Sequence, residues 1–360
     1  MNDLKIGVIV TCFNHAHQIT ACIESIIKSQ YLLATTSRVK LYTVVIDDCS
    51  SDDSFSILTE YVELGKIEVV KRNSSNKGVS FSRNRGIELC KNTDYIYFVD
   101  ADDVLHDNFI NLFKRVLSGD LIVSNFSYCS TVRGHISDEM FFPEDLDLQP
   151  TDIADYLLKY YERPNKNNLF TTCWSKLYRT KILFSDKNNW FNEKMHLCED
   201  TDFVYRFLSL QEGGVQFINE LLYVHTLDEP GRNNNKLSFG INVDLSQQLS
   251  FLTAVNSSKK YMEKHVLSKD ILEKKIDHCI SAYLIIYSIR SCLKVKSIGQ
   301  FVKIFLFWRQ TYKQPVFRKS ILNYSPKLAG GNALLPSLIK KRLYLLATLV
   351  SYYLCIKRYN

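Results

Sequence analysis

The sequence predicts an α/β fold with a mainly parallel sheet, followed by a helical and basic C-terminal region. Short apolar runs alternate with helical periodicity over about the first 125 residues, which is typical of right-handed βαβ units. Three of these runs end in polar or acidic residues. From about residue 242 onward only helical patterns remain. We therefore expect one domain at 1–240 and a helical region at 241–360.

Four strands are expected before residue 100, each followed by polar residues. They are the apolar or β-branched runs at 5–10, 41–46, 67–70 and 95–99. Helices should lie between them, because apolar residues recur at helical spacing in each interval. Ser51 or Asp52 can cap the second of these helices.

The pattern is looser beyond residue 120. A fifth strand is expected at 121–126, and helical stretches are expected at 153–161, 172–178 and 195–210. We expect the domain to have two halves, at about 1–125 and 126–240.

The composition is that of a folded protein with reduced thiols. The chain is 46% hydrophobic and 23% charged, as in ordinary globular domains. Its 10 cysteines form no Cys-X-X-Cys pair and no cluster at zinc spacing, which favours a cytoplasmic setting. We expect no secretory leader, because charged residues precede the first strand. No stretch reaches the roughly 18 consecutive apolar residues that a spanning helix needs.

The polar residues that follow three strands carry the candidate chemistry. They are the segments 11–14, 47–52 and 100–103, and parallel strands bring their carboxyl ends to one edge of a sheet, where such folds bind ligands. Asp100 and Asp102 lie one residue apart and can hold a divalent cation through oxygen ligands. An acidic turn after a strand is also common without any metal. The convergence of three such segments is what favours a binding site.

Six motifs in a fixed order extend this pattern. They are Val-Ile-Val-Thr-Cys-Phe-Asn at 8–14, Val-Ile-Asp-Asp-Cys-Ser-Ser-Asp at 45–52, Asn-Lys-Gly at 76–78 with Ser-Arg-Asn-Arg-Gly at 82–86, Asp-Ala-Asp-Asp at 100–103, Trp-Ser-Lys-Leu-Tyr at 174–178 and Glu-Asp-Thr-Asp-Phe at 199–203. Over about residues 4–225 the chain resembles the family 2 glycosyltransferases of the GT-A fold, the bacterial group that builds capsules, lipopolysaccharide and other surface glycans. Two departures stand out: Thr-Cys-Phe-Asn replaces the common Pro-Thr-Tyr-Asn, and Cys49 replaces the usual Gly.

The resemblance implies a nucleotide-sugar site in the first half of the domain and an acceptor site in the second. By position, Thr11, Phe13 and Asp48 would hold the nucleoside, with Asp48 facing the base and Phe13 packing beside it. Arg83 and Asp100 would contact the rest of the nucleotide.

The same resemblance implies a metal and a general base. Asp102 would ligate Mn²⁺ or Mg²⁺ on the donor diphosphate. Asp200 would take the proton of the acceptor hydroxyl, since the family inverts the anomeric carbon by direct displacement. Glu199 and Asp200 are equally typical of a helix first turn, where acids are favourable. His225 is a candidate ligand of the metal or the phosphate, or else a core histidine.

The expected function is transfer of a sugar, UDP-linked in the first instance, to a glycan or lipid-linked acceptor. Another nucleotide-sugar-using transferase is the alternative enzyme, but a sugar nucleotidyltransferase would need a Gly-rich, Arg-containing loop after the first strand, which 11–17 is not. A non-catalytic glycan- or nucleic-acid-binding protein is the other alternative. The intact Asp48, Asp102 and Asp200 argue against such a degenerate module.

The C-terminal region differs from the rest of the chain in charge. Residues 290–360 hold 14 of the 45 Lys and Arg residues and none of the 38 acids, so residues 1–289 carry a net charge of −7. The apolar run 343–356 is flanked by basic residues and is too short to span a bilayer. We expect peripheral contact with the inner face of the cell membrane. The residues expected at that interface are Trp308, Tyr344, Tyr352 and Tyr353.

Two alternatives remain for this region. It could be an ordinary helical subdomain with a solvated basic face, or it could bind nucleic acid. We expect no nucleic acid, because no known reader motif accompanies the charge.

Overall fold

The structure is a computed structural model of the 360-residue chain. It describes residues 4–36, 39–130, 134–164, 169–195, 197–227, 245–327 and 333–359. The chain forms two compact units, Met1–Gln149 with Leu169–Asn234, and Pro150–Asn168 with Asn235–Asn360. The domain boundary expected near residue 240 lies outside the described residues and stays a prediction. Helix α4 (Pro150–Glu162), expected in the first domain, groups with the C-terminal helices.

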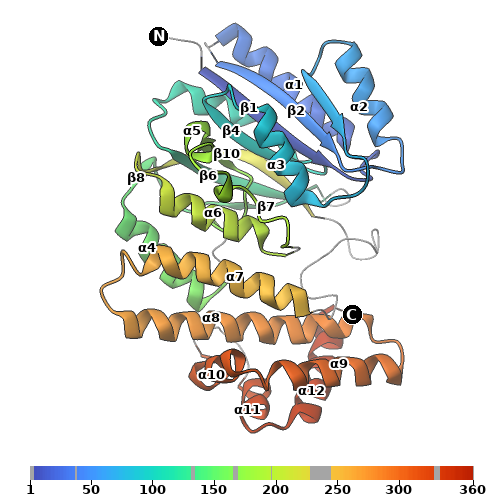
Figure 1. The fold of residues 1–360 in the computed structure, drawn as a ribbon, viewed down its shortest axis with the longest axis vertical. Coiled ribbons are helices and arrows are strands. Elements are labelled where there is room, and N and C mark those ends of the chain that lie inside the picture. Colours follow the sequence, from blue (N-terminus) through green and yellow to red (C-terminus); the bar gives the residue numbers. More distant parts are fainter. Residues whose placement is uncertain are drawn as a thin grey trace. The chain divides into compact units, whose positions relative to one another are not determined.

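The N-terminal unit is built on one mixed sheet (Figure 1). Within the described residues its strand order is β3-β2-β1-β4-β9-β6-β10-β5, with β7 beside β6 and β8 beside β10. The strands are β1 Leu4–Cys12, β2 Val39–Asp47, β3 Val69–Arg72, β4 Tyr95–Asp100, β5 Val104–Leu105, β6 Leu121–Ser130, β7 Gly134–Glu139, β8 Leu146–Leu148, β9 Lys176–Arg179 and β10 Val215–Leu227. Strand β1 pairs in parallel with β2 and β4, and β6 pairs in parallel with β10. The predicted α/β fold with a mainly parallel sheet is confirmed.

The helices of this unit follow the strands as expected. They are α1 Ile19–Thr36, α2 Ser54–Glu63, α3 Val79–Leu89, η1 Asp107–Lys114, α5 Thr180–Leu183, η2 Lys187–Asn189 and α6 Glu199–Leu210. The helical stretch expected at 172–178 is wrong. Residues Lys176–Arg179 form strand β9, antiparallel to both β4 and β6. Periodicity cannot separate a helix from a strand in so short an apolar run, and strand pairing decides the outcome.

The strand register brings three polar segments to one edge of the sheet. Thr11 on β1 is opposite Ile46 on β2 and Asp100 on β4, and Cys12 is opposite Asp47. The chain therefore leaves all three strands at the same level. This is the edge at which open α/β sheets bind ligands.

Helix α3 packs closely on strands β1 and β2. A Cβ atom added at Gly86 would lie 2.3 Å from Cγ2 of Ile9, which is fully buried in β1. The absent side chain lets α3 approach the sheet, and this sets the depth of every residue on that helix.

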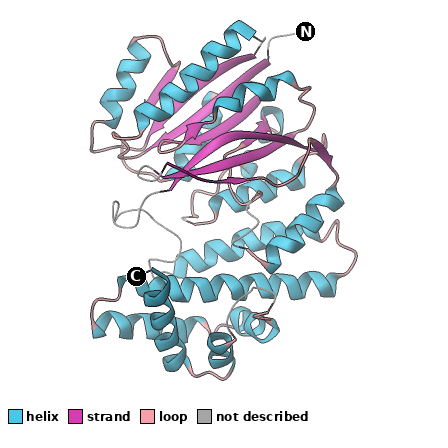
Figure 2. Cartoon of the chain, turned by 180° about the vertical axis from the view of Figure 1, so that it is seen from behind, coloured by secondary structure: helices cyan, strands magenta, loops and turns pink. Residues whose placement is uncertain are grey.

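The C-terminal unit contains helices only, within its described residues (Figure 2). After α4 they are α7 Leu245–Met262, α8 Lys269–Arg290, η3 Ser291–Lys294, α9 Ile298–Thr311, α10 Pro315–Asn323, α11 Leu334–Lys340 and α12 Tyr344–Tyr359. Helix α8 is the core of the unit, because α4, α7, α10 and α12 all contact it. No helix in the described ranges has the length and apolar character to cross a membrane.

The aromatic residues of this unit correct one expectation. Trp308 is 2% exposed and its indole N–H donates to Ser291 Oγ at 3.1 Å, and Tyr344 is also buried. These two rings face the core around α8, because the basic region is packed as a helical unit rather than as a detached anchor. Of the four aromatic residues expected at a membrane interface, Tyr353 is exposed and Tyr352 is partly buried.

We predict that Gly86→Ala destabilises the protein by about 1–3 kcal/mol, the usual cost of overpacking a well-filled core. The new methyl group must displace Ile9, whose β-branched side chain has little rotamer freedom. Gly299→Ala in α9 is the matched control: its Cβ would meet only Ser297 Oγ, at 3.9 Å. It should raise stability by about 0.4–1 kcal/mol. Urea unfolding measures both, and equal stability of the two variants would contradict this account of α3.

Candidate functional site

The segments that follow β1 and β2 are joined by side-chain hydrogen bonds. Asn14 Oδ1 accepts from the backbone N–H of Ser51 at 2.7 Å. Asp52 accepts from the backbone N–H of Ala16 at 3.0 Å with one oxygen and from that of Ser54 at 3.0 Å with the other. The N-cap position of α2 is Asp53 rather than the expected Ser51 or Asp52, but Asp52 accepts from the first N–H of the helix and also ties the two segments into one rigid rim.

Thr11 and Phe13 lie on this rim. Thr11 is partly buried, and its carbonyl accepts from the N–H of Ala101 at 3.2 Å, which links β1 to the acidic turn after β4. Phe13 is 41% exposed, so a large part of its ring faces solvent at the ligand edge of the sheet. An aromatic face in this position can pack beside a planar base.

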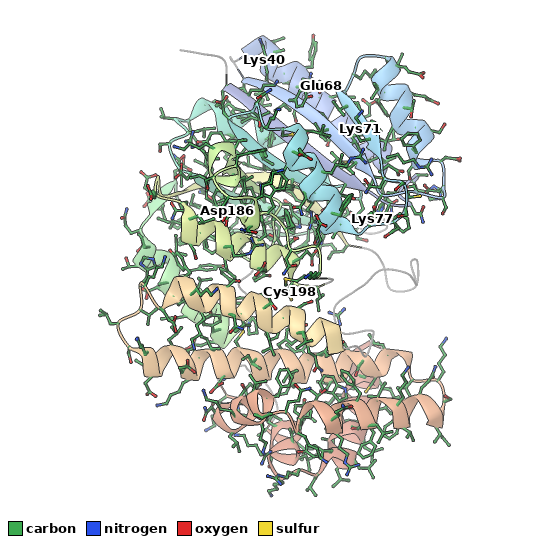
Figure 3. All side chains as sticks on the ribbon, viewed as in Figure 1. Lys40, Glu68, Lys71, Lys77, Asp186 and Cys198 are labelled. Atoms are coloured by element: carbon green, nitrogen blue, oxygen red, sulfur yellow. The ribbon has the colours of Figure 1, made fainter. Side chains whose placement is uncertain are left out.

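Asp48 organises the loop that precedes α3. Its Oδ1 accepts from Asn73 Nδ2 at 2.7 Å and from the backbone N–H of Lys77 at 2.9 Å, and its Oδ2 accepts from the N–H of Gly78 at 2.8 Å. Asp48 is 4% exposed. Figure 3 labels Lys77 at this loop. Oδ2 accepts only one of these three bonds, and a carboxylate oxygen can accept two, so it can still accept from a base. The expected contact between Asp48 and the base stays a prediction.

Strained backbone positions gather at the predicted motifs. Within the described ranges, five non-glycine residues have positive φ, and four of them lie in or next to the motifs: Asn14, Cys49 and Ser175 within them and Cys198 just before the last. Cys49, at φ 66°, stands where the family motif usually has Gly, and the left-handed region explains that preference. Such strain is typically retained where it holds functional groups in place.

Successive residues of α3 each bind a different part of the unit. Asn84 Oδ1 accepts from the backbone N–H of Phe191 at 2.9 Å, while its Nδ2 donates to the carbonyl of the same residue at 2.9 Å. Arg85 donates to Asn73 Oδ1 at 2.7 Å. Arg83, which precedes them on α3, binds Asp100 and Asp200. The helix thus holds the loop at Asn73, the segment before α6 and the acidic turn together.

Arg83 brings three of the predicted site residues together. Its Nη2 lies 3.0 Å from Asp100 Oδ1, and its Nη1 lies 2.5 Å from Asp200 Oδ1 and 3.5 Å from Glu199 Oε1. The residue is 3% exposed. Burial alone would lower the pKa of Arg83, but the carboxylates of Asp200 and Asp100 outweigh it and raise that pKa. The guanidinium therefore stays charged at the centre of the site.

Three carboxylates share this one cation. Burial raises the pKa of Asp100 even though Arg83 opposes the shift. Burial and the neighbouring Asp200 likewise raise the pKa of Glu199. The partly buried Asp102 lies two residues beyond Asp100 on the same turn. The local charge is negative, which favours uptake of a cation.

Asp200 and Asp202 have different surroundings. The second oxygen of Asp200 accepts from the backbone N–H of Cys173 at 3.2 Å, so both of its oxygens bind groups outside α6. Asp202 is 2% exposed and pairs with Arg206 at 2.8 Å. Asp200 is thus bonded to groups outside its helix, whereas Asp202 pairs within it, and the base role of Asp200 stays a prediction. Cys198, which precedes the helix, is labelled in Figure 3.

Asp103, which the sequence analysis gave no role, anchors the acidic turn. It is fully buried; its Oδ2 accepts from the hydroxyl of Tyr223 at 2.6 Å and its Oδ1 from the N–H of Thr226 at 2.7 Å. The hydroxyl of Tyr223 also accepts from the N–H of Asp100 at 3.2 Å. Strand β10 therefore fixes the turn that carries Asp100 and Asp102. The sequence marks Asp103 only as a third acid and gives no signal for Tyr223.

His225 lies at the edge of this anchor. Its Nδ1 is 3.0 Å from Asp103 Oδ2, and its ring stacks on Trp174 with centroids 5.1 Å apart. Burial alone would lower the pKa of His225, but the Asp103 carboxylate outweighs it and raises that pKa. An imidazolium suits contact with an anion, whereas a metal ligand must be neutral. Both expected roles of His225 stay predictions.

Comparisons with known proteins show what this chain is similar to. Two relatives are glycosyltransferase GlyA of Streptococcus pneumoniae, 24% identical over 55% of this chain and 29% of its own length, and the poly(ribitol-phosphate) β-N-acetylglucosaminyltransferase TarP of Staphylococcus aureus, 27% identical over 34% of this chain and 36% of its own. The chain thus spans about a third of the length of these relatives.

Solved structures show the same fold. Residues 1–349 of S. aureus TarS superpose with a TM-score of 0.57 over 99% of this chain and 93% of that one, at 18% identity. The complex of TarS with UDP-GlcNAc gives 0.59, also at 18% identity. The model of the Glycosyl transferase family 2 matches residues 7–214, and the chain belongs to that family.

Proposed function

We propose that this protein is an inverting glycosyltransferase. It would transfer a sugar from a UDP-linked donor to a glycan or lipid-linked acceptor in the synthesis of a bacterial surface polysaccharide. The observation that carries the proposal is the buried Arg83, which binds Asp100 on one side and Asp200 on the other. Arg83 thereby holds Asp100, which the resemblance implies in donor binding, and Asp200, which it implies as the general base.

The donor would lie along the rim formed by the ends of β1, β2 and β4. The exposed ring of Phe13 would pack beside the base, and Thr11 and Asp48 would contact the nucleoside. TarS and TarP are described as β-N-acetylglucosaminyltransferases, and one TarS structure contains UDP-GlcNAc. For this reason UDP sugars are the first donors to test.

The acidic turn fits a divalent cation. The described residues hold no group of three or more His, Cys, Asp or Glu side chains able to cage a metal. Mg²⁺ ordinarily uses one or two carboxylates together with substrate phosphates, so a caged site is not required. Asp102 would be the protein ligand of Mn²⁺ or Mg²⁺, with Asp100 held beside it by Arg83. A bound cation would offset the charge of the departing diphosphate.

Asp200 would act as the general base. Arg83 and the N–H of Cys173 each bind one of its oxygens and fix its orientation. Each oxygen keeps a further lone pair that can receive the proton of an acceptor hydroxyl. A positioned base of this kind contributes about 10²–10⁴-fold to the rate.

We further propose that the basic C-terminal region keeps the protein at the inner face of the cell membrane, without nucleic acid. Its charge and exposed apolar side chains support this. A different nucleotide-sugar-using transferase and a non-catalytic glycan- or nucleic-acid-binding protein remain the alternatives to test.

The proposal is tested by donor hydrolysis. The full-length protein is incubated with a panel of nucleotide sugars, with and without Mn²⁺, and the released nucleoside diphosphate is measured. Release from a UDP sugar that Mn²⁺ increases is the expected result. A lack of release from every donor, together with no binding of UDP, would contradict the proposal.

We predict that Asp102→Asn lowers the affinity for UDP in the presence of Mn²⁺ by about tenfold or more, a change of about 1.4 kcal/mol. The amide is a weaker ligand than the carboxylate, and its similar shape should leave the melting temperature unchanged. Asp107→Asn is the matched control, since that carboxylate is exposed and pairs with the exposed Lys28. Titration calorimetry decides: unchanged UDP affinity in Asp102→Asn would remove the metal assignment.

We predict that Asp200→Asn lowers kcat by about 10²-fold or more while UDP still binds. The amide oxygen can still accept from Cys173, but it cannot take the acceptor proton. Asp202→Asn should instead lower stability, because Arg206 loses its carboxylate partner and keeps only its bonds to the carbonyls of Asn188 and Trp190 and a weaker bond to the amide, and should leave kcat within a few-fold. Asp200 also pairs with the buried Arg83, so the variant should lose stability too, and kcat is measured on protein shown to be folded. Full turnover in Asp200→Asn would move the base to Glu199, and loss of UDP binding by the folded variant would favour a purely structural helix start.

A further inference from the structure

Helix α12 exposes five large apolar residues and, apart from Tyr344, buries small ones. Leu345, Leu346, Leu349, Tyr353 and Ile356 form one face at helical spacing, which we call the outer α12 face, and each is 43–62% exposed. Apolar residues at this spacing normally face a core. On α12 this apolar face is instead directed away from the core of the unit, which is the reverse of what a helix surrounded by water normally shows.

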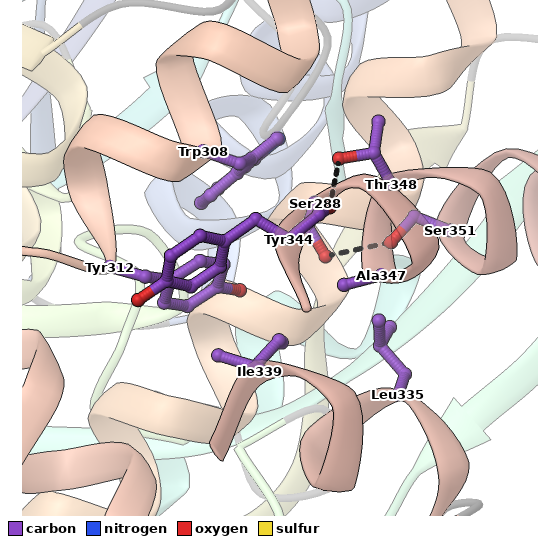
Figure 4. A pocket seen from close by; sticks show the side chains of 9 residues that line it. All are labelled: Ser288, Trp308, Tyr312, Leu335, Ile339, Tyr344, Ala347, Thr348 and Ser351. Atoms are coloured by element: carbon purple, nitrogen blue, oxygen red, sulfur yellow. Dashed lines mark hydrogen bonds between the residues drawn. The ribbon is translucent and has the colours of Figure 1, made fainter. Parts of the chain in front are cut away.

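The buried face of α12 shows that the outer face is not needed for packing within the unit. Ala347, Thr348 and Ser351 point inward and line a small pocket with Ser288 and Trp308 (Figure 4). Thr348 donates to the carbonyl of Tyr344 at 2.9 Å. These small side chains let the helix lie close to α8, so the leucines gain nothing from this contact.

Helix α9, which contacts α12, has a similar exposed stripe. Ile298, Val302 and Leu306 are 85%, 43% and 50% exposed and recur every four residues. Contiguous exposed apolar surface beyond a few hundred Å² generally marks a contact with a partner or a membrane. The C-terminal unit therefore has apolar surface that water does not stabilise.

The positive charge around the outer α12 face indicates which kind of partner covers it. Lys341 and Arg342 are exposed at one end of the outer α12 face and Lys357 at the other, and residues 290–360 contain no acid. A second copy would bring like charges together, which opposes association. An anionic bilayer offers acyl chains for the leucines and phosphates for the basic residues. Helix α12 has 16 residues, and each adds about 1.5 Å to its length. An amphipathic helix of this length is suited to lie in the plane of the interface.

We propose that the outer α12 face docks on the surface of an anionic phospholipid bilayer, with its leucines among the acyl chains and Lys341, Arg342 and Lys357 at the head groups. This rests on the membrane contact proposed above and names its surface and lipid class. It does not depend on the sugar that the protein transfers.

The first test compares full-length variants by sedimentation with vesicles. Vesicles of phosphatidylcholine with about one third phosphatidylglycerol should bind the wild type at 0.1 M salt, and Leu346→Glu/Leu349→Glu should reduce partitioning by about tenfold or more. Leu249→Glu in α7 is the matched control, because that leucine is on a helix of the same unit and is 54% exposed. It should partition within about twofold of the wild type.

Salt and lipid composition separate the two contributions. The Debye length falls from about 10 Å at 0.1 M to about 3 Å at 1 M, so high salt should weaken binding in part, whereas insertion of the leucines is not screened. Pure phosphatidylcholine vesicles should bind more weakly than anionic ones. Equal binding to both would overturn the choice of an anionic surface.

A second variant tests depth without disrupting the face. Tyr353→Trp places an indole at a position that is 62% exposed, whereas Trp174, Trp190 and Trp308 are 2–9% exposed. Its fluorescence should shift to the blue on anionic vesicles and be quenched by brominated phosphatidylglycerol. A variant that sediments with vesicles but is not quenched would overturn docking through this face.

Three further results would decide whether the outer α12 face docks on a bilayer. Absence of wild-type binding at low salt ends the proposal. A dimer seen by light scattering and lost in Leu346→Glu/Leu349→Glu would instead assign the face to a second copy. Donor hydrolysis without vesicles separates this proposal from the catalytic one: normal hydrolysis without vesicle binding overturns docking alone, and vesicle binding without hydrolysis overturns the proposed reaction alone.

Discussion

The N-terminal unit is organised around one buried cation. Arg83 is almost fully removed from water, and a buried guanidinium is tolerated only when carboxylates and hydrogen bonds surround it. Removing one partner of such a group typically costs about 3–5 kcal/mol. The end of β4 and the start of α6 must therefore both meet α3 at this point. Asn84 and Gly86 on the same helix support the position of Arg83, through the backbone of Phe191 and the close approach to Ile9.

The burial of Arg83 among carboxylates also leaves the site with negative charge that is held in place. A single guanidinium does not balance Asp100, Glu199 and Asp200, and Asp102 adds a further carboxylate on the same turn. Groups held in place before a ligand arrives stabilise developing charge without reorganisation during the reaction. The burial of Asp103 beneath the turn contributes to this, because it orients the acidic segment through Tyr223 and Thr226 rather than binding a ligand itself. Under the proposed function, this preorganised negative charge is what a metal–diphosphate unit would meet.

Sequence reasoning was informative where periodicity and parallel pairing act together. The ends of β1, β2 and β4 could be placed at one edge because three apolar runs each stop in polar residues. The choice of Asp200 over Asp202 came from the family resemblance and not from the residue pattern, since two residues on a helix differ by about 200° in direction and only the packing of α6 shows which one faces Arg83. Sequence reasoning also misassigned Lys176–Arg179, which is too short to show a period, and placed Trp308 and Tyr344 at a surface because their inward direction depends on α8.

Charge is divided along the chain in a way that bears on where the protein works. Residues 1–289 carry a net charge of −7, so an anionic surface would repel most of the chain, including the acidic turn. Residues 290–360 carry only positive side chains, and their exposed leucines lie among them. Coulomb attraction alone would be weakened by physiological salt, and apolar contact alone would not select a charged surface. The combination found on α12 provides both, so contact through this region opposes the repulsion of the rest of the chain.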